Sequence, residues 1–179
     1  MLHSIYWPHE FTPGATDHFS SNEIIVKGIT AAHVWPYLVN TACWSRYYGH
    51  ASDVVIHHAK GTELYDEATF DFTTLGLFVE AIVEEFIPPH GQEPGRLAWI
   101  GWVDKGSPQA LQLYHAWLIE NLPGDRVRIL TQESQLGIPA KKMALALPNP
   151  LIVAHQEWLN GLAMMAKKQC EEEIDTTFY

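Results

Sequence analysis

The chain has 179 residues, of which 47% are hydrophobic, and it carries a formal net charge of −10. This length and hydrophobic content predict one domain with a substantial core, which we expect to span residues 1–179. The excess of Asp and Glu over Lys and Arg argues against a basic surface that follows phosphates, so we expect no nucleic-acid partner and no attraction to anionic membranes.

Cysteine usage and hydropathy indicate a cytoplasmic protein. Cys43 and Cys170 are the only cysteines, and they form neither a CxxC motif nor a metal-ligand spacing, so we expect two reduced thiols. The N-terminus lacks the basic and apolar regions of a secretory signal, and no apolar run approaches the roughly 18 residues that a membrane span needs. We therefore expect no membrane insertion.

The first 18 residues predict an irregular N-terminal arm. Prolines and a glycine alternate there with aromatic residues, and we expect the rings to pin the arm onto the body of the domain. Residues 19–27 follow as a strand rich in β-branched residues that ends at Gly28. Thr30 then caps a helix over residues 31–40, and a short helical turn follows at residues 43–48.

Six stretches of alternating apolar and polar residues predict strands, and they cover residues 53–58, 62–73, 78–87, 96–103, 111–122 and 126–134. A helix over residues 138–147 is interrupted by Pro148 and Pro150, because proline lacks a backbone donor and clashes one turn back. The main helix runs from Leu151 to about Glu172. Its apolar stripe consists of Leu151, His155, Trp158, Leu162 and Met165. This order predicts a curved antiparallel sheet around the last helix, with a ligand-sized hollow between them.

Several segments carry a resemblance to a known family. They are FSSNEIIVKGI with TAAHVWPYLVNTACWSRYY, EFIPP with RLAWIGW, YHAWLIE with RVRILTQESQLG, and WLNGLAMMAK. In this order, from about residue 19 to residue 168, they resemble the START-like or SRPBCC superfamily of helix-grip proteins, and within it the polyketide cyclase/dehydrase-like branch. The resemblance implies an α+β helix-grip fold, with two short helices after the first strand and a curved antiparallel sheet around a long C-terminal helix.

The last two strands place the sharpest candidate residues. Successive strand side chains alternate between faces, and the more apolar set should face the hollow, which puts His115 on one strand and Glu133 on the next inside. The arginines of residues 126–134 then point to the other face, where we expect them to lie in water. A three-residue loop at residues 123–125 sets these two side chains opposite each other, whereas a two-residue turn pairs His115 with Gln132 and turns Arg128 inward. His115 and Glu133 are therefore candidate catalytic residues. Glu133 could raise the pKa of His115 and make it a general acid, or orient it as a base. A buried pair that satisfies itself, or orients a ligand without chemistry, is the alternative.

Aromatic residues supply flat apolar walls that suit a planar, aromatic or polycyclic ligand. The predicted ligand contacts are Trp99, His115, Trp117, Glu133, Phe70, Phe72, Tyr48, Arg46, Trp158 and Leu162. Arg46 would close over the mouth of the hollow and hold an anionic group, although such an arginine is more often part of a surface ion pair. A chain with seven tryptophans must also bury several of them merely to fold.

Metal and cofactor motifs do not stand out. No HExxH motif or histidine-rich triad is visible in the sequence, and His57 and His58 are neighbours that would point to opposite faces of a strand. The glycines are too dispersed for a phosphate loop, and a GxSxG nucleophile motif is absent. The expectation is no metal and no cofactor.

Three functions remain open. The first is a non-enzymatic carrier or binder of a small hydrophobic, aromatic, polycyclic or lipid-like molecule. The second, implied by the resemblance, is a polyketide cyclase, dehydratase or hydrolase that uses His115 and Glu133 as acid and base. The third is a protein-interaction module like the chaperone activators of the superfamily, for which the aromatic N-terminal arm would be the exposed patch or a contact in a homodimer.

Overall fold

The computed structural model describes residues 2–177, with side chains described as far as Cys170, so Met1 and the last two residues of the expected domain lie outside the described residues. The strands are β1 His18–Lys27, β2 Ala51–Ile56, β3 Thr69–Thr74, β4 Leu77–Ile87, β5 Gly95–Val103, β6 Leu111–Leu122 and β7 Arg126–Leu136. The α-helices are α1 Ala31–Val39, α2 Trp44–Tyr47, α3 Ile138–Ala144 and α4 Pro150–Thr177, with short 3-10 turns at His9–Phe11 and Thr41–Cys43.

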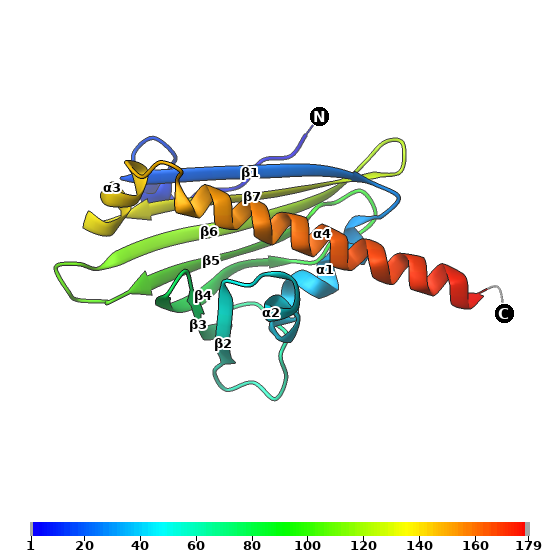
Figure 1. Cartoon of the computed structure of the whole chain (residues 1–179), viewed down its shortest axis with the longest axis horizontal. Helices are drawn as coiled ribbons and strands as arrows, with labels where there is room; N and C mark the ends of the chain where they lie inside the picture. Colours follow the sequence, from blue (N-terminus) through cyan, green and yellow to red (C-terminus); the bar gives the residue numbers. More distant parts are fainter. Residues whose placement is uncertain (1, 178–179) are drawn as a thin grey trace.

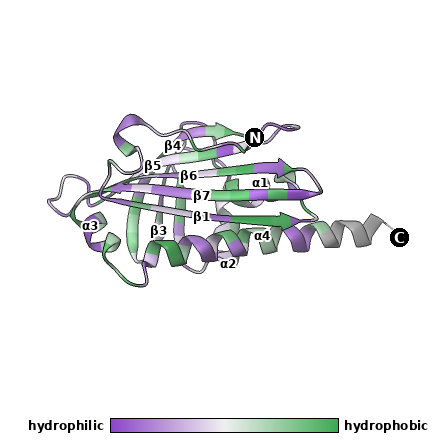
Figure 2. Cartoon of the chain, turned by 90° about the horizontal axis from the view of Figure 1, so that it is seen from above, coloured by the Kyte–Doolittle hydropathy of each residue, from purple (hydrophilic) through white to green (hydrophobic). Residues whose placement is uncertain are grey.

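One seven-stranded sheet in the order β1-β7-β6-β5-β4-β3-β2 forms the body of the domain, and every neighbouring pair is antiparallel. Figure 1 shows α4 lying across one face of this curved sheet, with α1 and α2 beneath the helix near the β2 end. In Figure 2, β1, β7, β6 and β5 run in nearly the same line as α4, while β3 crosses them. The predicted α+β helix-grip fold is confirmed.

The predicted strand at residues 62–73 is too long at its start, because β3 begins only at Thr69. The residues before it bend away from the sheet, with a positive φ at His58 and at Glu67. The backbone N–H of Leu64 donates instead to the carbonyl of Val39, at 2.9 Å, which ties this loop to the end of α1. Alternating polarity there came from a covering loop rather than from a strand.

The β6–β7 hairpin has the three-residue loop that the sequence predicts. Leu122 pairs with Arg126, so residues 123–125 form the turn, and Gly124 and Asp125 both have a positive φ. This register places His115 directly opposite Glu133, as predicted. The alternative pairing of His115 with Gln132 is excluded.

The outer face of the sheet carries a second core, and here the prediction that the arginines of residues 126–134 lie in water is wrong for Arg128. Its side chain is buried, and it contacts the carboxylate of Glu120 at 2.6 Å and that of Glu23. The N-terminal arm covers the group, because the carbonyl of His3 accepts a hydrogen bond from Arg128 at 2.9 Å.

Aromatic rings of the arm cover the same outer face. Trp7 and Phe11 lie with ring centroids 5.6 and 5.7 Å from that of Tyr114 on β6. Phe11 is fully buried, together with Leu118 and Leu130 of the sheet. The arm is therefore folded back on its own domain.

The crossing of α4 over α2 depends on a glycine. A Cβ atom added to Gly161 would overlap the backbone carbonyl oxygen of Tyr47, so only glycine permits this close approach. Among the described residues, no helix is both long and apolar enough to cross a membrane.

We predict that Gly161→Ala lowers the free energy of unfolding by about 1–3 kcal/mol, because overpacking outweighs the helix propensity of alanine, which by itself favours Ala by roughly 1 kcal/mol. Chemical denaturation measures the change. Gly49→Ala is the matched control, since nothing lies within 4 Å of the added Cβ atom. A Gly161→Ala protein as stable as the control would contradict the packing argument.

The buried carboxylate on the outer face predicts a loss of stability in acid. Burial by itself raises the pKa of Glu120, but hydrogen bonds from His3 and Arg128 outweigh it and hold the pKa below the ordinary value of 4.5. A lowered folded pKa means that the stabilisation is complete above pH 4.5 and is lost as the pH falls through the folded pKa.

We therefore expect Glu120→Gln to flatten the decline of unfolding free energy that the wild-type protein shows below about pH 4.5. Denaturation at a series of pH values measures that slope. Glu157→Gln is the control, because Glu157 forms an exposed pair with His50 and should leave the slope unchanged. Equal slopes for all three proteins would refute the assignment.

Candidate functional site

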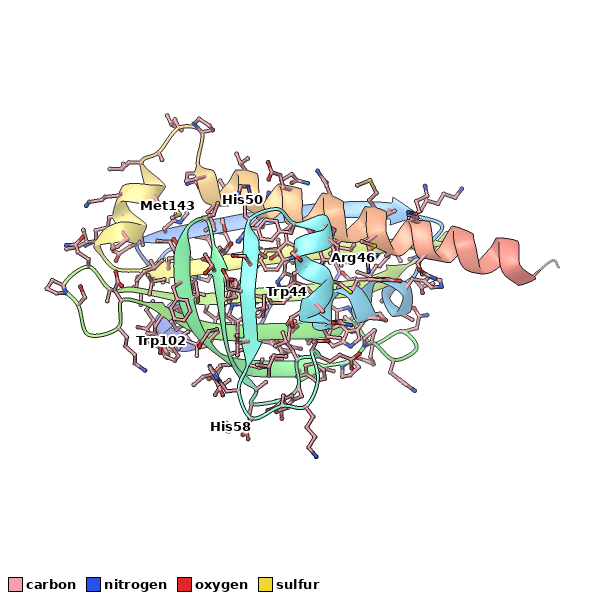
Figure 3. The ribbon with its side chains drawn as sticks, turned by 60° about the horizontal axis from the view of Figure 1, so that its bottom comes forward. Trp44, Arg46, His50, His58, Trp102 and Met143 are labelled. Atoms are coloured by element: carbon pink, nitrogen blue, oxygen red, sulfur yellow. The ribbon has the colours of Figure 1, made fainter. Side chains whose placement is uncertain are left out.

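A cluster of indole rings fills the middle of the space between the sheet and α4. Trp44, Trp99, Trp117 and Trp158 are each no more than 1% exposed. The ring of Trp158 on α4 has centroid distances of 5.1 Å to Trp44 and 5.3 Å to Trp117, and it stacks on Tyr48 at 4.3 Å. Trp44, at the start of α2 (Figure 3), donates from Nε1 to the carbonyl of Leu38.

The space left beside this cluster is a cavity of about 30 Å³, which holds about two water molecules. Ligand pockets for drug-sized molecules are typically about 300–1,000 Å³. The structure therefore does not contain the ligand-sized hollow that the sequence predicts. The reason is physical: a curved sheet with short inward side chains would leave the concave side open, but four indoles and Tyr48 occupy it here.

The cavity has apolar walls and one polar wall. Its apolar lining is Phe72, Leu75, Leu77, Val79, Trp99, Val103, Leu111, Leu113, Met143, Leu151 and Trp158. Its polar lining is Tyr48, Thr74, His115, Glu133, Gln135 and His155. Leu75, Leu77 and Met143 are only partly buried, so the β3–β4 turn and α3 form the side of the cavity nearest to solvent.

Three side chains from three elements meet on the polar wall. His115 of β6 places Nδ1 3.2 Å from Oε2 of Glu133 on β7, and His155 of α4 places Nε2 3.5 Å from the same oxygen. The two imidazole rings stack with centroids 4.5 Å apart and planes 16° from parallel. All three residues are at least 96% buried.

Neighbouring polar groups hold each member of this His-Glu-His cluster, which consists of His115, Glu133 and His155. Nε2 of His115 lies 2.7 Å from the hydroxyl of Thr131, and Nδ1 of His155 lies 3.3 Å from that of Ser20. Gln135 donates from its amide to Oε1 of Glu133, at 2.5 Å. In each histidine, one ring nitrogen faces Glu133 and the other contacts a neighbouring hydroxyl. In Glu133, one carboxylate oxygen faces the histidines and the other accepts from Gln135, so separate atoms hold each side chain in place.

The anchoring continues to the start of α4. Gln135 also contacts His18 at 2.8 Å, and Asn149 donates to the other ring nitrogen of His18 at 2.9 Å. Asn149 precedes α4 and accepts hydrogen bonds from the backbone N–H groups of Leu151 and Ile152. A line of side-chain hydrogen bonds therefore joins the N-terminal cap of α4 to Glu133.

The pKa of His115 argues against the general-acid role, which is one of the two roles that the sequence suggests. Burial of the ring, with the neighbouring His155, holds the pKa of His115 well below its ordinary value of 6.5. The expectation that Glu133 raises this pKa is therefore wrong, because desolvation penalises the charged imidazole more than the carboxylate stabilises it. His115 stays neutral near pH 7, in the form that can accept a proton or bind a metal.

Six of the ten predicted ligand contacts line the cavity, namely Tyr48, Phe72, Trp99, His115, Glu133 and Trp158. Phe70, Trp117 and Leu162 are buried in the core without lining it. Arg46 is exposed on α2 (Figure 3) and does not line the cavity either. The structure thus brings together the predicted aromatic wall and the predicted polar pair, without Arg46.

Sequence reasoning missed His155 and Met143 as site residues. His155 belongs to the apolar stripe of α4, and a histidine in such a stripe was the available signal that α4 adds a polar group to the interior. Met143 had no comparable signal, because its place at the cavity depends on how α3 folds back along the sheet.

Comparison with solved structures gives a relative and several fold neighbours. A hypothetical protein of Helicobacter pylori, jhp0584, is 44% identical in sequence, with a TM-score of 0.88, and the match covers 93% of this chain and 98% of that one. A norcoclaurine synthase from Thalictrum, a point mutant in complex with a transition-state analogue, is 9% identical with a TM-score of 0.57, covering 84% and 94% of the two chains.

The di-domain ARO/CYC protein BexL from the BE-7585A biosynthetic pathway is a further neighbour. It is 14% identical with a TM-score of 0.53, and the match covers 84% of this chain and 45% of BexL. No protein-family model matches the chain, and no curated protein matches it. The neighbours of low identity show a shared fold alone, whereas the Helicobacter protein shows close kinship. The chain therefore belongs to the family of the Helicobacter pylori protein jhp0584, and its fold is that of the START-like, or SRPBCC, helix-grip superfamily.

Proposed function

We propose that the protein binds a small, flat, largely apolar molecule with at least one oxygen atom, in the cavity between the sheet and α4. The observation that carries this proposal is the cavity itself, where apolar walls converge on one buried polar group of three side chains. Apolar pockets with a few convergent polar groups are the usual form of small-molecule sites. The aromatic wall of Phe72, Trp99 and Trp158 favours a planar ligand.

An unpaired hydrogen-bond donor supports the proposal that the ligand carries an oxygen atom. The Nε1–H group of Trp99 is buried and finds no hydrogen-bond partner among the residues that the structure describes. An unsatisfied buried donor costs about 1–3 kcal/mol, so an acceptor oxygen in the cavity would stabilise the complex by pairing with it. Thr74 also lines the cavity, and its hydroxyl contacts the hydroxyl of Tyr48 at 3.1 Å.

Binding requires the cavity to enlarge at its solvent side. Met143 is the partly buried side chain that α3 contributes, and Leu75 and Leu77 come from the β3–β4 turn. Helix α3 is only seven residues long, and Ala140 is its one buried residue. A short helix with little buried surface costs less to displace than the fully buried indole cluster.

The test compares two substitutions of the same kind. Val103→Phe places a ring in the cavity, and Val55→Phe places one on an exposed position of β2. With 2-naphthol as the probe, we expect Val103→Phe to weaken binding on the order of tenfold, which corresponds to about 1.4 kcal/mol, and Val55→Phe to leave it unchanged. Calorimetry or quenching of tryptophan fluorescence measures the affinity.

A shorter side chain in place of Met143, on the solvent side of the cavity, should have the opposite effect on the affinity. Met143→Ala is expected to strengthen 2-naphthol binding by several-fold, because the ligand no longer has to displace the methionine side chain. Met164→Ala, on the exposed face of α4, is the control. The proposal fails if the wild-type protein does not bind the probe, or if each cavity variant behaves like its control.

A second candidate function is acid–base catalysis on a bound carbonyl compound, of the cyclase, dehydratase or hydrolase type. The observation that favours it is the contact between neutral His115 and Glu133 on the cavity wall. A neutral imidazole oriented by a carboxylate is the form that removes a proton. Turnover of a poly-β-keto or ester substrate that survives His115→Gln would rule out this role, provided that the variant still binds 2-naphthol.

The interaction-module alternative has less support. Trp7 and Phe11 of the N-terminal arm pack on the outer face of the sheet, so these rings are not an open docking patch. The carrier function therefore remains the proposal that the described residues favour.

A further inference from the structure

We propose that His115, Glu133 and His155 bind one divalent transition-metal ion, with Zn²⁺ as the best match. The three candidate ligand atoms lie within 4.8 Å of one another, and all three residues are buried. Two imidazoles and one carboxylate are a ligand set that zinc and ferrous iron use in proteins. The proposal goes beyond the carrier function and does not depend on the organic ligand.

Two of the three spacings between the ligand atoms match a shared ion. Zinc–nitrogen and zinc–oxygen bonds of about 2.0–2.2 Å give ligand–ligand edges of roughly 3.3–3.6 Å in a tetrahedral site. In the structure, Oε2 of Glu133 lies 3.2 Å from Nδ1 of His115 and 3.5 Å from Nε2 of His155. The carboxylate and each histidine are thus already at coordination spacing.

The neighbouring hydroxyls fit both the empty and the occupied cluster. Without an ion, Nδ1 of His115 and Nε2 of His155 face Glu133, while the opposite ring nitrogens contact the hydroxyls of Thr131 and Ser20, which can donate to them. With an ion, each ring carries its proton on the other nitrogen and donates to the hydroxyl, which accepts by rotating. Second-shell partners of this kind fix the orientation of metal-binding histidines.

Charge is the second argument for a cation. The carboxylate of Glu133 is 95% buried, and its only ion-pair partners among the described side chains are the two histidines. The nearest arginine in sequence, Arg128, is engaged on the outer face by Glu120 and Glu23. Burying an ionised carboxylate without a cation is costly, and a bound metal ion removes that cost.

One adjustment is needed, and the cavity leaves space for it. Two rings only 16° from parallel do not aim both lone pairs at one point, so one ring must turn when the ion binds. His115 and His155 both border the 30 Å³ cavity, which accommodates that turn. The same cavity offers a fourth position for a water molecule, as in zinc sites that retain an open coordination position.

The sequence predicts no metal, and the positions of the three residues along the chain explain why. The ligands come from β6, β7 and α4, so no local motif exists. His155 enters the cluster only because α4 lies across the inner face of the sheet.

The test uses the full-length protein after treatment with a chelator. Titration with ZnCl₂, followed by calorimetry and by thermal unfolding, is expected to show one ion per chain and a raised Tm. Co²⁺ in place of zinc reports tetrahedral coordination through its absorption bands. We expect Glu133→Gln and His155→Gln to lower the affinity by at least about 100-fold, and Thr131→Val, which removes only the anchoring hydroxyl, to lower it about 10–100-fold.

Control variants separate this site from surface histidines. His50→Gln removes an exposed histidine paired with Glu157, and it should leave the zinc affinity unchanged. The proposal is overturned if the wild-type protein binds no zinc, or if folded Glu133→Gln and His155→Gln proteins, verified by circular dichroism, bind it as the wild type does. Zinc binding without 2-naphthol binding would refute the carrier function alone, and the reverse result would refute the metal site alone.

Discussion

The burial of Trp158 between α4 and the sheet is the interaction on which the rest of the structure depends. This one side chain contacts rings from α2 and from two central strands, and therefore couples the helix to both. Fully burying a large aromatic residue contributes several kcal/mol, because it removes its apolar surface from water. With Trp158 seated, the position of α4 along the sheet is determined, and so is the place at which His155, one turn earlier, enters the interior.

The position of α4 leaves the interior tightly packed near α2 and partly exposed near α3. Near α2, the indoles pack at the density of a protein core, and no guest can enter without unfolding that layer. Near α3, the side chains are aliphatic and partly exposed, and the polar wall lies behind them. The interior thus has a fully buried end near α2, which fixes the positions of three buried polar residues. Its other end, near α3, is partly exposed, and a ligand or an ion can reach these residues from there.

The sequence predicted the fold more fully than the site, and particular residues explain the difference. Strand alternation and the Pro123–Asp125 loop were local signals, so the pairing of His115 with Glu133 followed from them. The contribution of His155 depended on the packing of a helix against a sheet, which no local pattern encodes. The size of the cavity was misjudged for a related reason: counting aromatic residues does not reveal whether rings line a space or fill it.

The hydrogen bonds from Asn149 through His18 and Gln135 to Glu133 have a thermodynamic consequence. Asn149 belongs to the segment that joins α3 to α4, so an event that shifts α3 also changes how firmly Gln135 holds the carboxylate. Two occupants of the interior, one at the mouth and one at the carboxylate, would then alter each other's affinity by the same factor, because such linkage is reciprocal. In this way, a single relay of amides and an imidazole would make a small domain responsive to two chemically different signals at once.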